Sequence, residues 1–206
     1  MQIYETLLGH YGPRHWWPAE TPFEVVVGAI LTQNTAWKNV EKAIRNLKQL
    51  IPLTPQALLT LPEATLSEAI RPSGYYRQKA RRLRNFLGML ADRYECRLGS
   101  LFDLPTEALR EELLTLSGIG PETADSILLY AAGRPVFVID TYTLRILSRH
   151  ELLSDETSYA EAQQWITDHL PEDIELFNEF HALLVNVGKD YCRPRPRCEG
   201  CPLEGV

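Results

Sequence analysis

The stretch Leu116-Ser-Gly-Ile-Gly-Pro-Glu-Thr-Ala124 decides the fold, because it predicts two helices joined by a very short turn. Apolar residues at helical spacing place one helix over 106–116 and the next over 123–132. We expect Gly118 and Gly120 to allow positive φ and close approach, and Ile119 to anchor the turn in the core. The backbone N–H groups that begin the second helix then offer a site for an anion.

Helix signals extend along the rest of the chain. Thr54-Pro55 and Pro62-Glu63 are typical helix starts, and Pro72-Ser73-Gly74 is a stop. Basic and apolar residues alternate at helical spacing over 79–94, which predicts an amphipathic helix with a basic face. The run Val136-Phe-Val-Ile139 resembles a strand, but it is too short and isolated to build a sheet, so we interpret it as a buried connection. The sequence therefore predicts an all-α fold.

Composition sets the broad class. A chain of 206 residues can bury a real core in one unit or in two small lobes. No apolar run approaches the roughly 20 residues that span a bilayer, and no leader is visible, so we expect a cytoplasmic protein without a membrane partner. The net charge of −6 argues mildly against nucleic acid, although basic residues gather over 77–84 and 193–197. Such clusters are more often ordinary solvated faces.

Asp140 stands at the start of a predicted helix over 141–150, where aspartate is a common N-cap. With the Gly-Ile-Gly turn upstream, the stretch 113–149 resembles the helix-hairpin-helix DNA glycosylases typified by endonuclease III, with Val138-Ile-Asp-Thr141 as their catalytic loop. The resemblance implies that Asp140 stabilises the positive charge that builds on the deoxyribose as a base departs, and orients a water. It also implies that DNA is bound by the hairpin residues Gly118, Ile119, Gly120 and Thr123.

Glu122 occupies the position where strand-cutting members of this family carry a lysine that attacks the sugar. No lysine lies between Lys79 and Lys189. The resemblance thus implies a monofunctional glycosylase that releases a base and leaves an abasic site. Glu122 has two interpretations: a first-turn carboxylate that complements the helix dipole, or a pocket residue that assists catalysis.

Aromatic and polar motifs narrow the resemblance. Trp16-Trp17-Pro18, Gly28-Ala-Ile-Leu-Thr-Gln-Asn-Thr35 and Arg71-Pro-Ser-Gly-Tyr75 are similar to the 3-methyladenine DNA glycosylase branch. That branch implies a base pocket lined by Trp16, Trp17, Pro18 and Trp37, in which an indole attracts a cationic base by about 1 to 2 kcal/mol. The tryptophans are alternatively packing residues between two lobes. Gln33 is expected to fill the stack that a flipped base leaves, or to be a surface amide.

Three of the four cysteines lie within the last fifteen residues, as Cys192-x5-Cys198-x2-Cys201. The spacing resembles the loop that holds a [4Fe-4S] cluster in endonuclease III, and thiolates also suit zinc. The family's fourth cysteine would fall beyond Val206. Three interpretations therefore stay open: the given sequence is cut short, the site has three ligands, or it binds another metal. Cys96 is expected to be structural, and the three arginines of this loop, Arg193, Arg195 and Arg197, would present basic charge to DNA.

Together these observations predict two α-helical lobes. One is a six-helix barrel lobe over 21–133 with the hairpin, and the other combines 1–20 with 134–206 and carries the iron–sulfur loop. The predicted function is base excision repair by a monomeric DNA glycosylase, associated with a bacterial or archaeal nucleoid, that removes an alkylated purine such as 3-methyladenine from double-stranded DNA. The alternatives are a glycosylase for uracil, mismatched thymine or another lesion, and a non-catalytic DNA-binding iron–sulfur protein.

Overall fold

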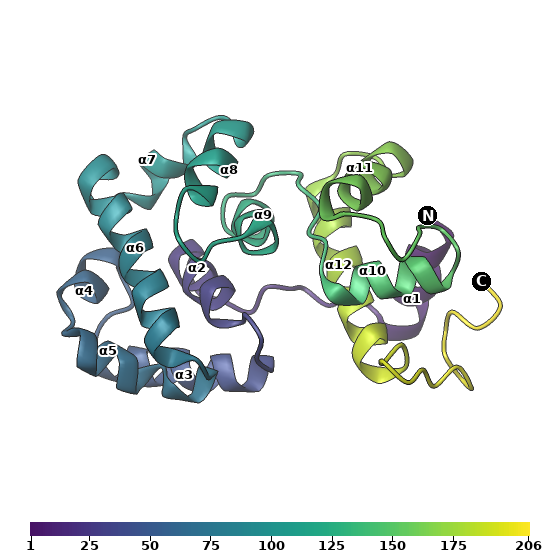
Figure 1. Cartoon of the computed structure of the whole chain (residues 1–206), viewed down its shortest axis with the longest axis horizontal. Helices are drawn as coiled ribbons and strands as arrows, with labels where there is room; N and C mark the ends of the chain where they lie inside the picture. The colour runs from purple at the N-terminus through teal and green to yellow at the C-terminus, as the bar shows by residue number, and fades with distance from the viewer. The chain divides into compact units, whose positions relative to one another are not determined.

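The computed structural model describes all 206 residues, and every regular element in it is a helix (Figure 1). The all-α prediction is confirmed. None of the helices combines the length and hydropathy needed to cross a membrane. In chain order the helices are α1 (Gln2–Tyr11), α2 (Pro22–Leu31), α3 (Trp37–Leu50), α4 (Pro55–Thr60), α5 (Glu63–Ala69), the 3₁₀ turn η1 (Arg71–Ser73), α6 (Tyr76–Tyr94), α7 (Leu98–Phe102), α8 (Thr106–Leu114), α9 (Pro121–Tyr130), α10 (Thr141–Arg149), α11 (Tyr159–His169) and α12 (Ile174–Asp190).

The chain forms two compact units, one inserted into the other. The inserted unit runs from Ala19 to Ala132 and holds α2 to α9. The discontinuous unit combines Met1–Pro18 with Gly133–Val206, so its first helix and its last three helices come from opposite ends of the sequence. Each unit therefore has its own core and carries its own set of the predicted site residues.

Helix α2 is the centre of the inserted unit. Every residue from Phe23 to Leu31 is buried, because the segment is apolar on all sides and packs on α3, α6 and α9. Thr21 caps its start by accepting a hydrogen bond from the N–H of Glu24. The carboxylate of Glu24 is itself buried and pairs with Lys48 at 2.8 Å, which satisfies the one charge in the helix.

Helix α6 begins at Tyr76, earlier than the sequence pattern indicates, because Gly74 and Tyr75 turn the chain with φ values of +69° and +45°. The predicted basic face is wrong at one position. Lys79 is only 1% exposed, and its Nζ donates to the carbonyls of Leu31 at 2.8 Å and Ser73 at 2.6 Å. Burial, together with the charge of Arg82, lowers the pKa of Lys79 to about 8.

The Gly-Ile-Gly turn joins α8 and α9 as predicted, with Ile119 buried. Only Gly118 takes a positive φ, of +90°. The expectation of positive φ at Gly120 is wrong, because this residue is the extended N-cap of α9 with φ −96° and ψ 179°. Pro121 follows at the first helical position, where its missing N–H costs nothing.

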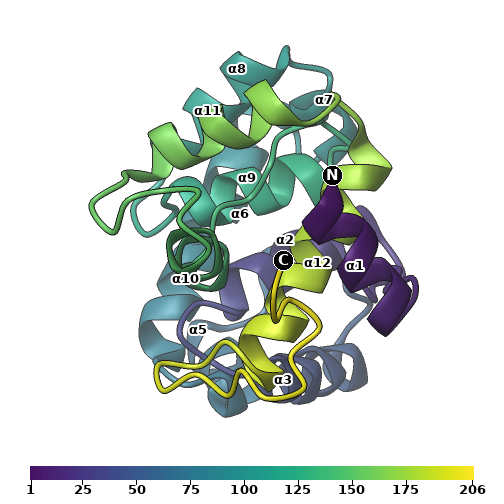
Figure 2. The same ribbon diagram turned by 90° about the vertical axis from the view of Figure 1, so that its right-hand side faces the viewer.

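In the discontinuous unit, α12 packs against both α1 and α10 (Figure 2). Gly188 permits the close crossing with α10, since a Cβ there would lie 2.8 Å from the Cβ of Tyr142. The stretch 136–139 is the buried connection that the sequence predicts, and Phe137 makes edge contacts with Phe177 and Phe180. The segment thus leads directly from the core of this unit to Asp140.

Candidate active site

Asp140 is the N-cap of α10. Its Oδ1 accepts hydrogen bonds from the backbone N–H of Thr143 at 2.7 Å and from the hydroxyl of Thr143 at 2.8 Å. Its Oδ2 lies 3.7 Å from Nε2 of His181 on α12. The residue is 9% exposed, so a carboxylate stands at the edge of the core without being sealed in it.

The pKa of Asp140 reflects a balance that favours the charged form. Burial raises the pKa, but the His181 ring and the two donors of Thr143 outweigh burial and hold it below the ordinary value of 3.8. The carboxylate is therefore ionised at neutral pH. Thr143 supplies its hydrogen bonds and His181 lies nearby, whereas Lys189 interacts with it only through its charge. No arginine or lysine forms an ion pair with Asp140, which leaves its charge available to a nearby cation.

The Trp-Trp-Pro segment is anchored to α12 by its preceding backbone. The N–H groups of Arg14 and His15 donate to the two carboxylate oxygens of Glu179, each at 2.6 Å. The half-buried rings of Trp16 and Trp17 follow, with centroids 5.3 Å apart and planes tilted by 51°. One helix thus positions both the tryptophan pair and the histidine that faces Asp140.

The inserted unit holds the other predicted site residues. Trp37 is the half-buried first residue of α3, and Glu122 is exposed in the first turn of α9. Gln33 lies between α2 and α3, and its Nε2 donates to the Gly118 carbonyl at 3.0 Å and to Oγ1 of Thr123 at 2.8 Å. These bonds tie Gln33 to the hairpin, so filling a vacated base stack would require breaking them.

The three clustered cysteines do not form a metal-binding group. No set of three histidine, cysteine, aspartate or glutamate side chains is arranged to hold a metal, so the described geometry does not fit a [4Fe-4S] cluster. Instead Arg149 contacts Sγ of Cys192 at 3.3 Å, and Arg145 donates to the Cys192 carbonyl at 2.7 Å. Burial, with Cys192 and Cys198 nearby, raises the pKa of the Cys201 thiol. The cluster stays a prediction from sequence.

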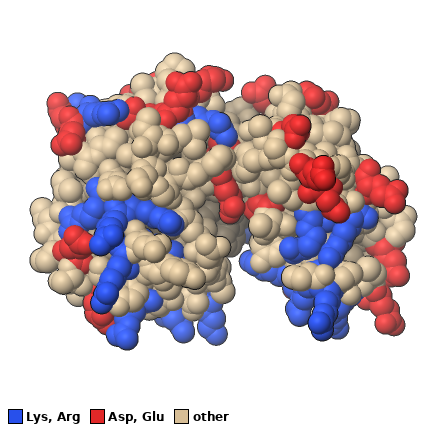
Figure 3. Space-filling model, in the orientation of Figure 1, with Lys and Arg blue, Asp and Glu red and all other residues tan.

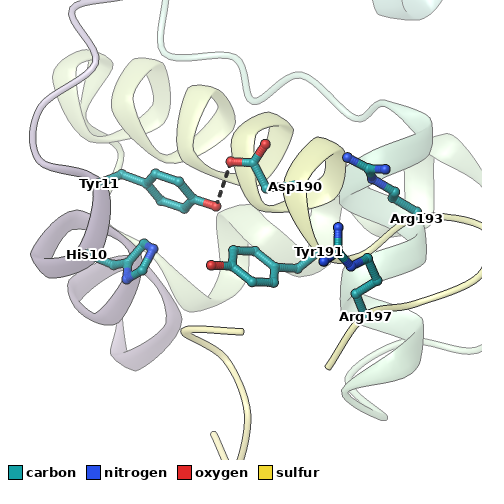
Figure 4. Close-up of a pocket in the computed structure, with 6 residues that line it drawn as sticks. All are labelled: His10, Tyr11, Asp190, Tyr191, Arg193 and Arg197. Atoms are coloured by element: carbon teal, nitrogen blue, oxygen red, sulfur yellow. Dashed lines mark hydrogen bonds between the residues drawn. The ribbon is translucent and has the colours of Figure 1, made fainter. Parts of the chain in front are cut away.

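A surface pocket of about 310 Å³ lies beside this loop, and sequence reasoning did not find it (Figure 4). Tyr11 donates to Asp190 at 3.2 Å across it, and burial and this carboxylate raise the pKa of the phenol. The two partners are 179 residues apart, so no local pattern could bring them together. The residues that line the pocket come from the end of α1, the end of α12 and the cysteine loop: His10, Tyr11, Asp190, Tyr191, Arg193 and Arg197.

Tyr75 ends the motif Arg71-Pro-Ser-Gly-Tyr75, but the sequence pattern assigned it no role of its own. Its side chain is 67% exposed, and its left-handed backbone presents it at the start of α6. The signal was available, because a large aromatic follows directly on the Pro72-Ser73-Gly74 helix stop. Exposed aromatic side chains on basic helices are suited to contacts with nucleic-acid bases.

Charge is unevenly distributed despite the net value of −6. Figure 3 shows lysine and arginine side chains gathered into patches on the visible face of each unit, with acidic side chains concentrated elsewhere. The positively charged patches therefore permit contact with a polyanion, although the net negative charge of the chain argues against it.

The helical fold, the Gly118 hairpin and the capping aspartate define a helix-hairpin-helix protein of the endonuclease III fold. Residues 27–172 match the HhH-GPD superfamily of base excision DNA repair proteins, and the chain belongs to this family.

Individual relatives agree with this assignment. The chain is 47% identical over 204 residues to a Methanocaldococcus jannaschii protein provisionally named a DNA repair glycosylase, covering 98% of this chain and 93% of the relative. It resembles an endonuclease III in a non-covalent complex with DNA, with a TM-score of 0.83, 25% identity and coverage of 98% and 90%. It also resembles the H. pylori 3-methyladenine DNA glycosylase bound to 1,N6-ethenoadenine, with a TM-score of 0.78, 29% identity and coverage of 91% and 96%.

Proposed function

We propose that this protein is a DNA glycosylase that hydrolyses the bond between deoxyribose and a damaged base flipped out of double-stranded DNA. The observation that carries the proposal is Asp140, a buried and ionised carboxylate that forms no ion pair or hydrogen bond with an arginine or lysine. Departure of the base makes the sugar cationic, and a fixed carboxylate stabilises that charge. The same carboxylate can orient the attacking water.

The hairpin supplies the contact with the DNA backbone in this proposal. Gly118, Ile119 and Gly120 leave the N–H groups at the start of α9 directed outward, where the helix dipole favours an anion. Such a contact fixes the position of the enzyme on the duplex without reading its sequence. The exposed side chain of Tyr75 would then support the strand from which the base has been flipped out.

We further propose that base release is not followed by strand cleavage. Glu122 has no amine with which to attack the sugar, and it complements the positive end of α9 instead. Lys189 is the lysine whose charge interacts with Asp140 within the same unit, and burial lowers its pKa. It is therefore the residue to test as a hidden Schiff-base nucleophile.

The proposed substrate is an alkylated purine such as 3-methyladenine. The adjacent rings of Trp16 and Trp17 offer electron-rich faces that favour a cationic base. The H. pylori relative, whose name states this specificity, supports the proposal. The glycosidic bond of 3-methyladenine is weakened, so its cleavage requires less catalysis than that of a normal nucleotide.

A panel of single-lesion duplexes tests the proposal by measuring the released base. The panel carries 3-methyladenine, 7-methylguanine, hypoxanthine, uracil and mismatched thymine in one sequence context. We expect release to be fastest for 3-methyladenine, and Asp140→Asn to lose it. Preference for uracil or thymine would replace the substrate assignment, and no release from any duplex would favour a non-catalytic DNA-binding protein.

Borohydride trapping tests the absence of lyase chemistry. We expect no covalent protein–DNA adduct, because water rather than an amine attacks the sugar. An efficient cross-link that disappears in Lys189→Met would instead assign the nucleophile to Lys189. Iron and sulfide analysis of the same protein tests the predicted cluster independently.

A further inference from the structure

We propose that Gln33 is a positioning residue that organises the hairpin for a DNA phosphate, and that Arg82 is an additional side chain that binds this phosphate. Gln33 connects three elements: its loop between α2 and α3, the hairpin, and helix α6. Its Nε2 donates to the Gly118 carbonyl and to Thr123, and its Oε1 accepts from Arg82. We call this set of Gln33, Arg82, Gly118 and Thr123 the Gln33 clasp.

The chemistry of its partners fixes the orientation of the Gln33 amide. A guanidinium can only donate, so it must face Oε1, and a carbonyl can only accept, so it must face Nε2. The amide therefore cannot be reversed without losing both bonds. Neither a carboxylate nor an apolar side chain of the same length could satisfy Arg82 and Gly118 together.

The clasp also directs the hydroxyl of Thr123. This residue is third in α9, among the N–H groups of the first turn, and is 6% exposed. Because its Oγ1 accepts the proton of Gln33, its own proton is left to donate in another direction. An oxyanion held by the first turn of α9 is a suitable acceptor.

Arg82 contributes a charge that no carboxylate neutralises in the clasp. Its side chain lies against the hairpin so closely that a Cβ on Gly118 would be 2.6 Å from Arg82 Cγ. Arg93, further along α6, is instead paired with Glu112 at 2.6 Å. The charge of Arg82 therefore lies directly against the hairpin, where a phosphodiester gains most from it.

The inference rests on the proposed DNA contact of the hairpin, and the experiment separates the two. The probe is a fluorescein-labelled duplex with a tetrahydrofuran abasic-site analogue, titrated by anisotropy at several NaCl concentrations. The variants are Gln33→Met, Arg82→Met and Thr123→Val. The matched controls are Gln49→Met, an exposed glutamine of α3, and Arg93→Met, the paired arginine of α6.

We expect Arg82→Met to weaken binding about tenfold and to reduce the slope of log K against log salt by about 0.9, the value for one lost phosphate contact. Gln33→Met should weaken binding by a similar factor, and the Gln33→Met/Arg82→Met double variant should bind little worse than either single variant. This non-additivity is the sign that Gln33 acts through Arg82. Both controls should bind like the original protein.

Two outcomes overturn different parts of the scheme. Unchanged binding by both Thr123→Val and Arg82→Met would overturn both side chains as phosphate contacts, while the contact of the hairpin N–H groups would stand. Weaker binding by those two variants, with Gln33→Met unchanged, would remove only the positioning role. Thermal unfolding of each variant identifies any general loss of stability. A loss of binding by Arg82→Met without a change in the slope of log K against log salt would assign Arg82 a purely structural role.

Discussion

Each unit of this protein buries one prominent aspartate, and the two are satisfied in different ways. Asp125 in the inserted unit is 0% exposed and receives Nε and Nη2 of Arg110 at 2.6 and 3.1 Å. Asp140 in the discontinuous unit is 9% exposed and receives two donors from Thr143, with His181 at 3.7 Å.

We interpret this difference as that between a structural carboxylate, Asp125, and the proposed catalytic carboxylate, Asp140. A bidentate arginine neutralises its partner and fixes its geometry, so the field of Asp125 is largely cancelled nearby. Neutral donors orient Asp140 while leaving its negative charge intact. Burial alone therefore does not identify a functional carboxylate; the charge of the partner does.

The largest expected effect is on catalysis by Asp140→Asn. Asparagine is an equally good N-cap, so folding should be retained while the charge is lost. We expect single-turnover base release to fall by about 10³-fold, with DNA affinity nearly unchanged. Asp125→Asn, assayed at a temperature where it is folded, is the control and should release base at close to the original rate. Equal losses in both variants would contradict the comparison.

Asp125→Asn should instead reduce stability. It leaves the half-buried Arg110 guanidinium without its counter-charge, at a cost of about 3 kcal/mol in the free energy of unfolding. Urea unfolding followed by circular dichroism measures this loss. Glu112→Gln, which breaks the more exposed pair with Arg93, should cost less than about 1 kcal/mol. A similar cost for both would mean that the burial of Asp125 is unimportant.

His181→Phe tests the neighbour of Asp140. Phenylalanine preserves the ring contact with Phe137 but removes the polar group that helps to lower the pKa of Asp140. We expect release to slow by about tenfold, and the acid limb of the pH–rate profile to move to higher pH because the Asp140 pKa rises. A slower rate with an unmoved acid limb would indicate a packing effect only.

Among the changes at the Asp140 site, the smallest expected effect comes from Thr143→Val, which removes one donor to Asp140. A carboxyl whose pKa is lowered by folding stabilises the protein above its ordinary value of 3.8, and this contribution is lost as pH falls through the lowered pKa. The variant should therefore be less stable by about 1 kcal/mol at pH 6, with the difference disappearing at strongly acidic pH. A difference that is constant with pH would show that the hydroxyl acts independently of the Asp140 charge.

Local features of the fold could be predicted from sequence because their partners are close along the chain. The cap formed by Asp140 involves a residue three positions away, and the hairpin is set by consecutive residues. The Gln33 clasp and the Glu179 anchor join residues separated by 49 to 165 positions, so their geometry needed the folded chain. The burial of Lys79 was hidden for the same reason, since its acceptor on Leu31 lies 48 positions upstream.

The insertion of one unit into the other has a consequence for synthesis. Residues 19–132 are contiguous, so the hairpin and the clasp can be complete before the rest of the chain leaves the ribosome. The discontinuous unit cannot finish folding until α12, which carries Glu179 and His181, has been synthesised. Helix α1 is synthesised first and lacks its partner α12 until then. If the proposed roles hold, the phosphate-binding clasp would fold before the Asp140 site, and the nascent protein would pass through a stage at which it binds a strand without releasing a base.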